Sequence, residues 1–403
     1  MPAVREIVAE FQGLYGPYTL TEKVLQKIWL RGDFALAAAR LADGRRLEVL
    51  APGEWNLLGG PDFRGARLRI DGGAETAADI EVHFRAGDWN AHGHDSDPAY
   101  RAVGLHVVLF PSDPSACPSR RIDGVVLPEL ALLPLLHRGL EEYAADDALE
   151  ALTARDGWRR FAELAIRPPT ELKQLVRDHA ADRWRQKLRY ARLRIDKLGW
   201  SAAAHHTALE ILGYRHNRAP MLTVAGRCGL GEWVGGLTAD EAYRRGASFW
   251  LLRGVRPANH PRVRLEQYAR WTVARPDWTQ RLRTMTLARP GAVADEGPIG
   301  ANRRALGVAE LRRRFAEDLT GGAVNGTRLE TLICDGFVPL LAAESGQDLF
   351  PHWFHWFLGD VPQEARTALR RLGLAGGSDR PLCHGCGQGL LGWLLQQRTA
   401  ASP

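Results

Sequence analysis

Residues 59–110 read GGPDFRGARLRIDGGAETAADIEVHFRAGDWNAHGHDSDPAYRAVGLHVVLF and decide the fold of the N-terminal part of the chain. A Gly-Pro-Asp turn places Asp62 before an alternating segment, and eighteen residues separate Asp62 from Glu81. The Asp-Gly-Gly sequence at 71–73 predicts the turn of a β-hairpin between these two acids. Side chains two residues apart on a strand share a face, so the hairpin would bring Asp62, Glu81 and His83 to one edge.

The segments on either side of this hairpin predict further elements. Residues 1–30 have helical periodicity, with Thr21 as a candidate N-cap. Residues 34–51 predict a second hairpin, residues 97–103 one or two helical turns, and residues 105–110 a buried strand. The expected order is therefore a helix, three or four strands, a short helix and another strand.

Length and composition predict a soluble globular protein of two or three domains, and the order of the predicted elements indicates the α+β class. The chain has 403 residues, enough for more than one hydrophobic core. From about residue 129 helical periodicity dominates, and an acidic, Ala-rich stretch at 141–154 is a candidate for the boundary between lobes. We expect an α/β domain over 1–130 and a helical, basic domain over 131–403.

Cysteine content and the N-terminus bear on the compartment. The five cysteines are sparse and odd in number, which argues against a disulfide framework and favours a reducing cytoplasm. The first residues lack the charged-then-apolar pattern of a secretory signal, and no apolar run approaches the length of a membrane helix. We therefore expect a cytoplasmic protein without a membrane partner.

Two acids and a base at one sheet edge are the groups that metal-assisted hydrolysis requires. Asp62, Glu81 and the carbonyl of Val82 could supply oxygen ligands for Mg²⁺ or Mn²⁺. His83 would lie beside Glu81, and an imidazole titrates near neutrality, which suits a general base. The alternative is structural: an Asp in a turn, with a strand Glu and His half exposed.

The pattern Pro61-Asp62 followed by Glu81-x-His83, within this order of elements, resembles the PD-(D/E)xK nuclease superfamily. The resemblance implies a restriction-endonuclease-like lobe, and it makes Glu22 of the first helix a candidate additional catalytic acid. His83 replaces the usual Lys, and imidazole tilts the choice of metal towards Mn²⁺. We expect a metal-dependent nuclease acting on DNA rather than RNA, or alternatively a nuclease-like scaffold that binds nucleic acid without cutting it.

A histidine-rich segment follows the second acid. His92, His94 and Asp97 could form a zinc or manganese site, which would make the protein a metalloenzyme for a small substrate. Alternatively they lie next to the active site or contact substrate, as Tyr100 could. For His106, inside an apolar strand, we favour a structural role.

Basic side chains beyond residue 155 indicate an anionic partner. The net charge is +6, and Arg185, Arg189 and Arg192 recur at helical spacing with interleaved aromatic residues. A second Arg-rich segment has Arg256, Asn259 and Arg264 around two prolines, and Arg forks suit phosphate. These are the candidate nucleic-acid contacts. A solvated helix face and a structural network between helices are the respective alternatives.

The C-terminal tail contains one CxxC motif, Cys383 to Cys386. A structural zinc ion needs about four ligands, and candidates for the others are Cys334 and one of His352, His355 or His384. Because a lone CxxC supplies only two ligands, a pair of packed or reactive thiols is the favoured interpretation.

A longer set of motifs resembles the bacterial family called domain of unknown function 2851. These motifs are GPDF at 60–63, EVH at 81–83, Asp88-Trp89, His92-x-His94 and LHVV at 105–108. The resemblance extends over nearly the whole chain, including RPANHPRVRLEQYA at 256–269 and the tail with its cysteines. It implies a bacterial cytoplasmic protein, and the chemistry has to be argued from the residues.

Overall fold

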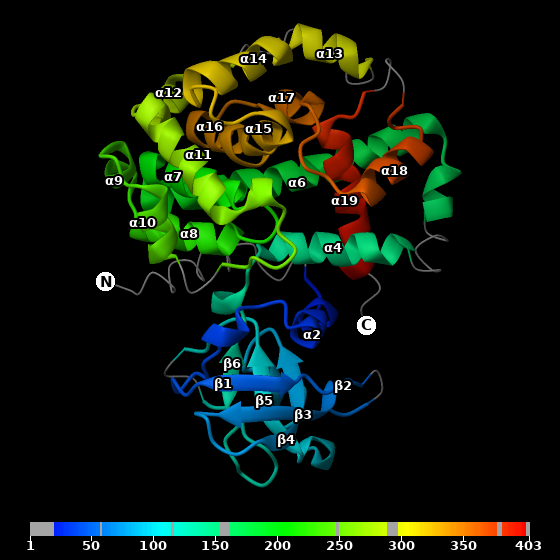
Figure 1. The fold of residues 1–403 in the computed structure, drawn as a ribbon. Helices are drawn as coiled ribbons and strands as arrows, with labels where there is room; N and C mark the ends of the chain where they lie inside the picture. Colours follow the sequence, from blue (N-terminus) through cyan, green and yellow to red (C-terminus); the bar gives the residue numbers. More distant parts are fainter. Residues whose placement is uncertain are drawn as a thin grey trace. The chain divides into compact units, whose positions relative to one another are not determined.

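A computed structural model describes residues 20–56, 59–113, 117–153, 161–246, 250–287, 297–376 and 381–399. The chain divides into two compact units, the first formed by the residues up to Ala144 with Trp250 and Leu251. This first unit contains a curled sheet, and the second is helical (Figure 1). The mixed α+β class is thus confirmed. We expected the first domain to end at residue 130, and the compact unit continues to Ala144.

Helix α2 (Glu22–Arg31) is the first described element, and residues 1–19 of the predicted helix lie outside the described residues. Its buried face has the predicted spacing, with Val24, Leu25, Ile28 and Trp29. Gly32 ends the helix with φ 58°, a left-handed conformation that suits glycine. Thr21 occupies the N-cap position, but its side chain makes no capping hydrogen bond.

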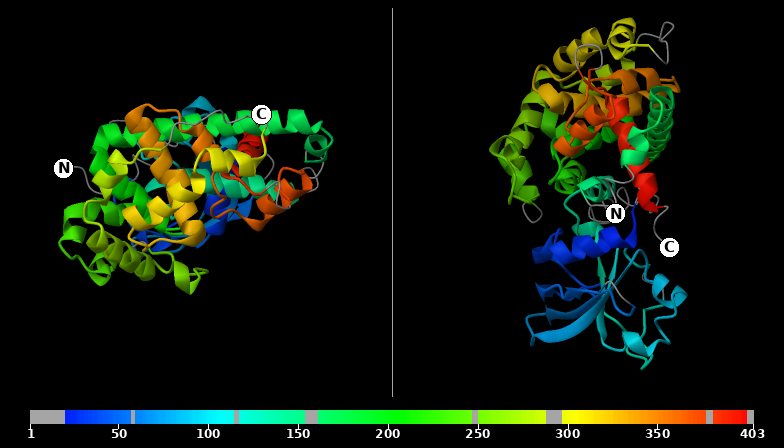
Figure 2. Two further views of the ribbon diagram at one scale, coloured as in Figure 1. Left: turned by 90° about the horizontal axis from the view of Figure 1, so that it is seen from above. Right: turned by 90° about the vertical axis from the view of Figure 1, so that its right-hand side faces the viewer.

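The sheet has six strands: β1 (Leu47–Ala51), β2 (Glu54–Trp55), β3 (Phe63–Ile70), β4 (Thr76–His83), β5 (Val103–Val108) and β6 (Glu129–Ala131). Their order is β1-β3-β4-β5-β6, and β2 pairs with β3. The pairs β1–β3 and β3–β4 are antiparallel, whereas β4–β5 and β5–β6 are parallel (Figures 1 and 2). Because β5 lies between two parallel neighbours, its sequence is a nearly continuous apolar run.

The hairpin predicted around residues 71–73 is confirmed as β3 and β4. Asp71 and Gly72 have φ angles of 49° and 71°, which the tight turn requires. Across β4 and β5, Glu81 is paired with His106 and His83 with Val108. The two candidate site residues of β4 therefore lie beside a buried central strand.

The hairpin predicted over residues 34–51 is confirmed only around its turn, where Arg40 and Arg46 form an antiparallel bridge and the N–H of Leu41 donates to the carbonyl of Arg45 at 2.9 Å. Residues 36–38 form the short 3-10 helix η2 (Leu36–Ala38), and β1 pairs with β3 instead. The N–H of Ala35 donates to the carbonyl of Leu135 at 2.8 Å. The Ala-rich segment offers few of the β-branched side chains that favour a strand, and the longer β3 provides the partner for β1.

Two short elements connect β4 to β5: α3 (Asp88–Ala91) and the 3-10 helix η3 (Pro98–Tyr100). The latter confirms the helical turn predicted at 97–103. Trp89, Tyr100, Val103 and Leu127 form a buried cluster that anchors this connection. The loop carrying His92 and His94 is therefore fixed at both ends by packed aromatic residues.

The remaining elements are η4 (Leu133–Leu135), α4 (Leu140–Thr153), α6 (Pro169–Leu198), α7 (Trp200–Leu212), α8 (Arg218–Arg227), α9 (Leu230–Val234), α10 (Ala239–Arg245), η6 (Pro257–Asn259), α11 (Pro261–Ala274), α12 (Trp278–Thr284), α13 (Ile299–Ala305), α14 (Val308–Arg314), η7 (Phe315–Leu319), α15 (Gly326–Leu332), η8 (Ile333–Phe337), α16 (Val338–Ser345), α17 (Phe350–His355), α18 (Gln363–Arg371) and α19 (His384–Thr399). Helices dominate from Leu140 rather than from residue 129, because 129–135 form β6 and η4. Within the described ranges, no helix has both the length and the apolar character needed to cross a membrane.

Glycines of α19 allow its close packing in the helical unit. A Cβ at Gly389 would lie 2.0 Å from the carbonyl oxygen of Val176 in α6, and a Cβ at Gly385 would lie 2.1 Å from the ring of Phe354. These distances are far below van der Waals contact. The glycines within and after the CxxC motif therefore serve helix packing.

Candidate functional site

The two acids meet where β3 begins beside the end of β4. The backbone N–H of Asp62 donates to Glu81 Oε2 at 3.0 Å, and the N–H of Val82 donates to Asp62 Oδ2 at 3.0 Å. Each carboxylate thus accepts from the backbone of the other segment, so the pairing of β3 with β4 holds both in place. His83 Nε2 lies 3.5 Å from Glu81 Oε1, which completes the predicted group of three.

Helix α2 holds Asp62 from a second direction. Gln26 Nε2 donates to Asp62 Oδ1 at 2.6 Å, and Trp55 Nε1 donates to Gln26 Oε1 at 3.1 Å, which fixes the orientation of the amide. Burial, followed by the negative charge of Glu81, raises the pKa of Asp62 to about 8. A cation beside the two carboxylates would stabilise the ionised form of Asp62 against both burial and the repulsion from Glu81.

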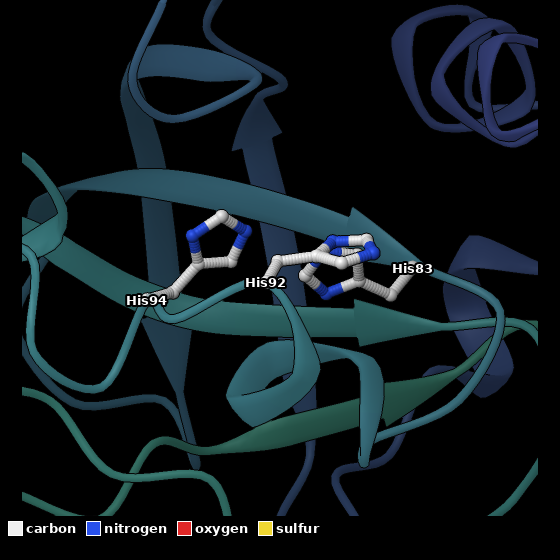
Figure 3. Close-up of side chains that lie close together, drawn as sticks. All are labelled: His83, His92 and His94. Atoms are coloured by element: carbon white, nitrogen blue, oxygen red, sulfur yellow. The ribbon is translucent and has the colours of Figure 1, made fainter. Parts of the chain in front are cut away.

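Three imidazole groups gather on the other side of Glu81. His83 ends β4, and His92 and His94 follow α3, so that the rings converge (Figure 3). The candidate ligand nitrogens of these three residues all lie within 4.8 Å of one another. Glu81 Oε1 lies 3.4 Å from His94 Nε2, and His92 Nδ1 lies 3.1 Å from His83 Nε2. Ligands bound at about 2.0–2.1 Å to one ion are roughly 3–4 Å apart. The distances of 3.1 and 3.4 Å suit a shared metal, and a wider nitrogen separation would have to shorten on binding.

We call the following five residues the acid–histidine site: Asp62, Glu81, His83, His92 and His94. The expected oxygen ligands were Asp62, Glu81 and the carbonyl of Val82, and that assignment stays a prediction. Both oxygens of Asp62 already accept hydrogen bonds, whereas Glu81 Oε1 faces imidazole nitrogens. The geometry therefore offers a nitrogen-rich set of ligands in addition to the predicted oxygens.

A chain of hydrogen bonds behind His83 sets its tautomer. His83 Nδ1 lies 2.9 Å from His106 Nε2, and His106 Nδ1 lies 2.9 Å from Ser119 Oγ. Because a carbonyl oxygen only accepts, the Ser119 hydroxyl donates to the carbonyl of Ala86 at 3.5 Å. Ser119 Oγ then accepts from His106, and His106 Nε2 accepts from His83. This direction of donation leaves the Nε2 lone pair of His83 facing Glu81.

The buried imidazoles of His83 and His106 are both neutral near pH 7. Burial, followed by the neighbouring His106, lowers the pKa of His83 to about 2. Burial, followed by His94, lowers the pKa of His106 to about 3. Neutral imidazole is the form that binds a metal ion, so the environment keeps His83 ready to act as a ligand.

Tyr100 forms one wall of the acid–histidine site. Its ring stacks on His94 with 3.8 Å between centroids and 24° between planes. Burial, followed by the charges of Glu81 and Asp62, raises the pKa of Tyr100 to about 12. The hydroxyl therefore stays protonated near neutral pH and can donate a hydrogen bond. The role predicted for Tyr100, near the active site or in contact with substrate, stays a prediction.

Comparison with known proteins assigns the chain to a family. A family model described as Protein of unknown function (DUF2851) matches residues 22–232, which is more than half of the chain. The chain belongs to the DUF2851 family. No curated protein and no solved structure matches it. The DUF2851 match contains the entire acid–histidine site, and the resemblance of the C-terminal part stays a prediction.

Two further acids of the DUF2851 match differ in their relation to the site. Glu22 is half-buried, and burial is the main cause that raises its pKa. His92 lowers the pKa of Glu22, and Asp88 raises it. Glu22 is thus within electrostatic range of the site, and its catalytic role stays a prediction. Asp97 is exposed and accepts from the N–H of Ala99 at 2.8 Å, so it caps η3. Its candidate role beside His92 and His94 has no support in these contacts.

The predicted nucleic-acid contacts are partly exposed and partly structural. Arg185, Arg189 and Arg192 are exposed on α6, and Arg185 pairs with Asp182. Arg192 also contacts the carbonyl of Ala343 at 3.4 Å. These side chains remain accessible to an anionic partner.

The second Arg-rich segment lies beyond the DUF2851 match. Arg256 is exposed, whereas Arg264 is half-buried and donates to Asn259 Oδ1 at 2.5 Å. Asn259 therefore positions Arg264. Their role as nucleic-acid contacts stays a prediction.

The CxxC motif is buried at the start of α19. The N–H of Cys386 donates to Cys383 Sγ at 3.4 Å. A hydrogen bond from Cys386 lowers the pKa of the Cys383 thiol, and the same interaction, followed by burial, raises that of Cys386 well above its usual value. Among the described residues, the one group of donors that could hold a metal contains no cysteine. These contacts therefore give no support to the candidate zinc site.

Three residues that orient side chains of the acid–histidine site were not predicted to do so from the sequence. Gln26 lies four residues after Glu22 on the same helix, a spacing that could have indicated a shared face. His106 lies opposite Glu81 in the parallel pairing, which no local pattern reveals. Ser119 lies in a connection rich in Pro and Ser and gives no signal in the sequence.

Proposed function

We propose that this protein is a metal-dependent hydrolase that cleaves phosphodiester bonds in nucleic acid, with DNA as the expected substrate. One observation carries the proposal: Glu81 joins the half-buried Asp62 on one side and the imidazoles of His83 and His94 on the other. Such a cluster combines two acids with neutral nitrogen donors at the edge of a rigid sheet.

The residues present fit a divalent transition metal. Three imidazole nitrogens and Glu81 Oε1 form a mixed N,O set, which favours Mn²⁺ or Zn²⁺ over Mg²⁺. A bound divalent ion would polarise a phosphoryl oxygen and lower the pKa of a bound water. Mn²⁺ is the metal we expect, in agreement with the substitution of His83 for Lys.

The protein groups have separable tasks in this proposal. Glu81 and the three histidines would hold the ion, and the His106–Ser119 chain keeps the Nε2 lone pair of His83 directed at it. Asp62 is braced by Gln26 and Val82 and would position Glu81 or take a proton from water. The Tyr100 hydroxyl, protonated near neutral pH, could donate to a phosphate oxygen.

The topology of the first unit supports a nuclease-like scaffold. A helix precedes four strands, β1 to β4, whose pairings are antiparallel, and β5 returns parallel to β4 after the short helical elements. The candidate acids lie at the start of β3 and in β4, as the PD-(D/E)xK resemblance implies. The exposed arginines of α6 would attract the phosphate backbone.

A second candidate is a metalloenzyme for a small substrate. His83 and His94 are buried, with exposures of 1% and 8%, whereas His92 is exposed, so two of the three histidines are screened from solvent. That burial favours a compact substrate over a polymer. The two functions share the metal site and differ in substrate.

The test is a cleavage assay with labelled single-stranded DNA, duplex DNA and RNA, in Mn²⁺, Mg²⁺, Zn²⁺ or EDTA. We expect cleavage that depends on Mn²⁺ and falls at least about 100-fold in Glu81→Gln, Asp62→Asn and His94→Gln. Asp95→Asn is the matched control, because Asp95 is exposed in the same loop. Its activity should equal that of the wild type.

Other outcomes separate the alternatives. Cleavage that is unchanged in Glu81→Gln would refute the assignment of the site. Tight metal binding without affinity for nucleic acid would favour the small-substrate enzyme. Binding of DNA that weakens with salt, without turnover in any metal, would identify a scaffold that no longer cuts.

A further inference from the structure

The helical unit contains a second group of charged residues, centred on Arg328 of α15. Arg328 Nη2 lies 3.0 Å from Asp360 Oδ2, and Nη1 donates to the carbonyl of Ile211 at 3.2 Å. The guanidinium carbon lies 4.2 Å from the centre of the Tyr214 ring. With an exposure of 7%, Arg328 is a buried cation that these three contacts hold in one orientation.

Arg264 of α11 is the second cation of this group. Its Nη2 donates to Asn259 Oδ1 at 2.5 Å and its Nη1 to Gln267 Oε1 at 2.8 Å, and both partners are neutral amides. Among the described residues, Arg264 makes no ion pair with a carboxylate. The Nε atoms of Arg264 and Arg328 are buried without a hydrogen-bond acceptor. The charge of Arg264 is therefore oriented but not neutralised.

Electrostatic effects show that these groups are near one another. Burial lowers the pKa of Arg328 to about 10. The positive charges of Arg264 and Arg218 lower this pKa further, whereas Asp360 and Tyr214 raise it. Burial likewise lowers the pKa of Arg264, and Asp360 and Tyr214 raise it. We call Arg218, Arg264 and Arg328 the arginine cluster.

One carboxylate is shared within this cluster. Asp360 pairs with Arg328, and its other oxygen accepts from Thr327 at 2.7 Å. Glu210 lies 3.6 Å from Arg218 Nε but binds Arg194 more closely, at 2.8 Å. Asp360 is thus the carboxylate near both Arg264 and Arg328, so these two guanidinium groups share one negative charge.

The turn that carries Tyr214 is strained. Tyr214 has φ 56°, which a non-glycine residue rarely adopts. A Cβ at the preceding Gly213 would lie 2.4 Å from the carbonyl oxygen of Asn217, so the connection from α7 to α8 is tight. Strain of this kind is retained where the surrounding structure imposes it, often beside ligand sites. It places the Tyr214 ring against Arg328.

We propose that the arginine cluster binds a phosphate group. Planar guanidinium forks bind phosphate oxygens with paired hydrogen bonds, and a phosphate would balance the excess charge of Arg264 and Arg328. Tyr214, Arg264 and Asp360 are half-buried, with 24% of the Asp360 side chain exposed, so solvent reaches part of this group. The phosphate belongs to a nucleic-acid backbone or to a small phosphorylated molecule. The proposal does not depend on the acid–histidine site.

Thermal unfolding of the full-length protein in EDTA tests this site, with inorganic phosphate as the probe and NaCl at equal ionic strength as reference. We expect phosphate to raise Tm beyond the NaCl reference. Arg264→Gln should weaken phosphate binding at least tenfold, whereas Asp360→Asn should strengthen it by removing the competing carboxylate. Arg281→Gln is the matched control, because Arg281 is exposed and paired with Asp277.

Two further variants separate binding from loss of structure. Arg264→Lys keeps the charge without the fork, so its affinity should lie between those of wild type and Arg264→Gln. Glu81→Gln should bind phosphate as the wild type does, which distinguishes a failure here from a failure of the proposed hydrolase. Equal Tm shifts in phosphate and NaCl, or equal affinities of wild type and Arg264→Gln, would overturn the proposal.

Oligonucleotides with and without a 5′-phosphate identify the source of the phosphate. If Arg264→Gln weakens binding of both oligonucleotides, the cluster contacts the nucleic-acid backbone. If it weakens binding of inorganic phosphate alone, the ligand is a small phosphorylated molecule. Either result supports a phosphate site.

Discussion

At the scale of single residues, Glu81 connects the two halves of the acid–histidine site. Its Oε2 accepts from the backbone of Asp62, and its Oε1 faces His83 and His94. The sequence predicted the grouping of Asp62, Glu81 and His83, because a turn and the two-residue period of a strand are local features. It left open whether His94 would join Glu81, because that depends on how the connecting loop folds back.

His106 offers a residue-level prediction about metal binding. Replacing His106 with Leu removes the acceptor for His83 Nδ1, so the affinity for Mn²⁺ should fall about 10–100-fold. His106→Gln retains an amide oxygen that can accept this bond and should bind Mn²⁺ more tightly than His106→Leu. Isothermal titration calorimetry with Mn²⁺ measures both.

Thermal unfolding of the same metal-free variants provides the control. The two substitutions occupy the same buried position, so the comparison separates the hydrogen bond from general loss of packing. Equal Mn²⁺ affinities of His106→Leu and wild type would contradict a positioning role for His106.

At the scale of elements, the turn of the β3–β4 hairpin was predictable and the partner of β1 was not. Asp71-Gly72-Gly73 specifies its turn through backbone conformation alone. The choice of β3 rather than residues 34–42 as the partner of β1 depends on the length and side chains of a distant strand. The short β6 was missed for a similar reason, since three residues of sequence carry little periodic signal.

The packing of α19 leads to an element-level prediction. Gly389→Ala would put a Cβ 2.0 Å from the Val176 carbonyl oxygen, and it should destabilise the helical unit by about 3 kcal/mol or more. The intrinsic helix propensity of Ala offsets only about 1 kcal/mol of this cost. Urea unfolding followed by circular dichroism measures the difference.

Gly387→Ala serves as the control on the same helix. Its Cβ would meet the tip of the flexible Leu358 side chain at 2.9 Å, so the cost should be distinctly smaller. If the two variants were equally stable, close contact between α19 and α6 would not explain the glycine at 389.

At the scale of the whole molecule, both units bury neutral histidines, and this predicts acid lability. The pKa is lowered to about 2 for His83, 3 for His106, 4 for His205 and 3 for His206, chiefly by burial. Each value is below the 6.5 of an unfolded chain. As the pH falls below about 6.5, the unfolded state therefore binds protons that the folded state does not. The folded state is stabilised above that pH and loses this stability as the pH falls.

The measurement is the free energy of unfolding between pH 7.5 and 4, by tryptophan fluorescence in EDTA. We expect a decrease of about 1.4 kcal/mol per pH unit for each such histidine once the pH is well below 6.5. Unfolding at acid pH should involve both units, since each contains two of these residues. Stability that is unchanged between pH 7 and 4.5 would contradict the buried neutral state.

The sequence by itself determined the α+β class, the face of α2, the β3–β4 hairpin and the juxtaposition of Asp62 with Glu81. Turn conformation and side-chain periodicity act over a few residues, and the chain encodes them directly. Only the tertiary structure decided that His106 and Ser119 orient His83, and that Arg264 and Arg328, from separate helices, both lie near Asp360. Those contacts join segments far apart in the chain, and packing of the core, rather than any local pattern, brings them together.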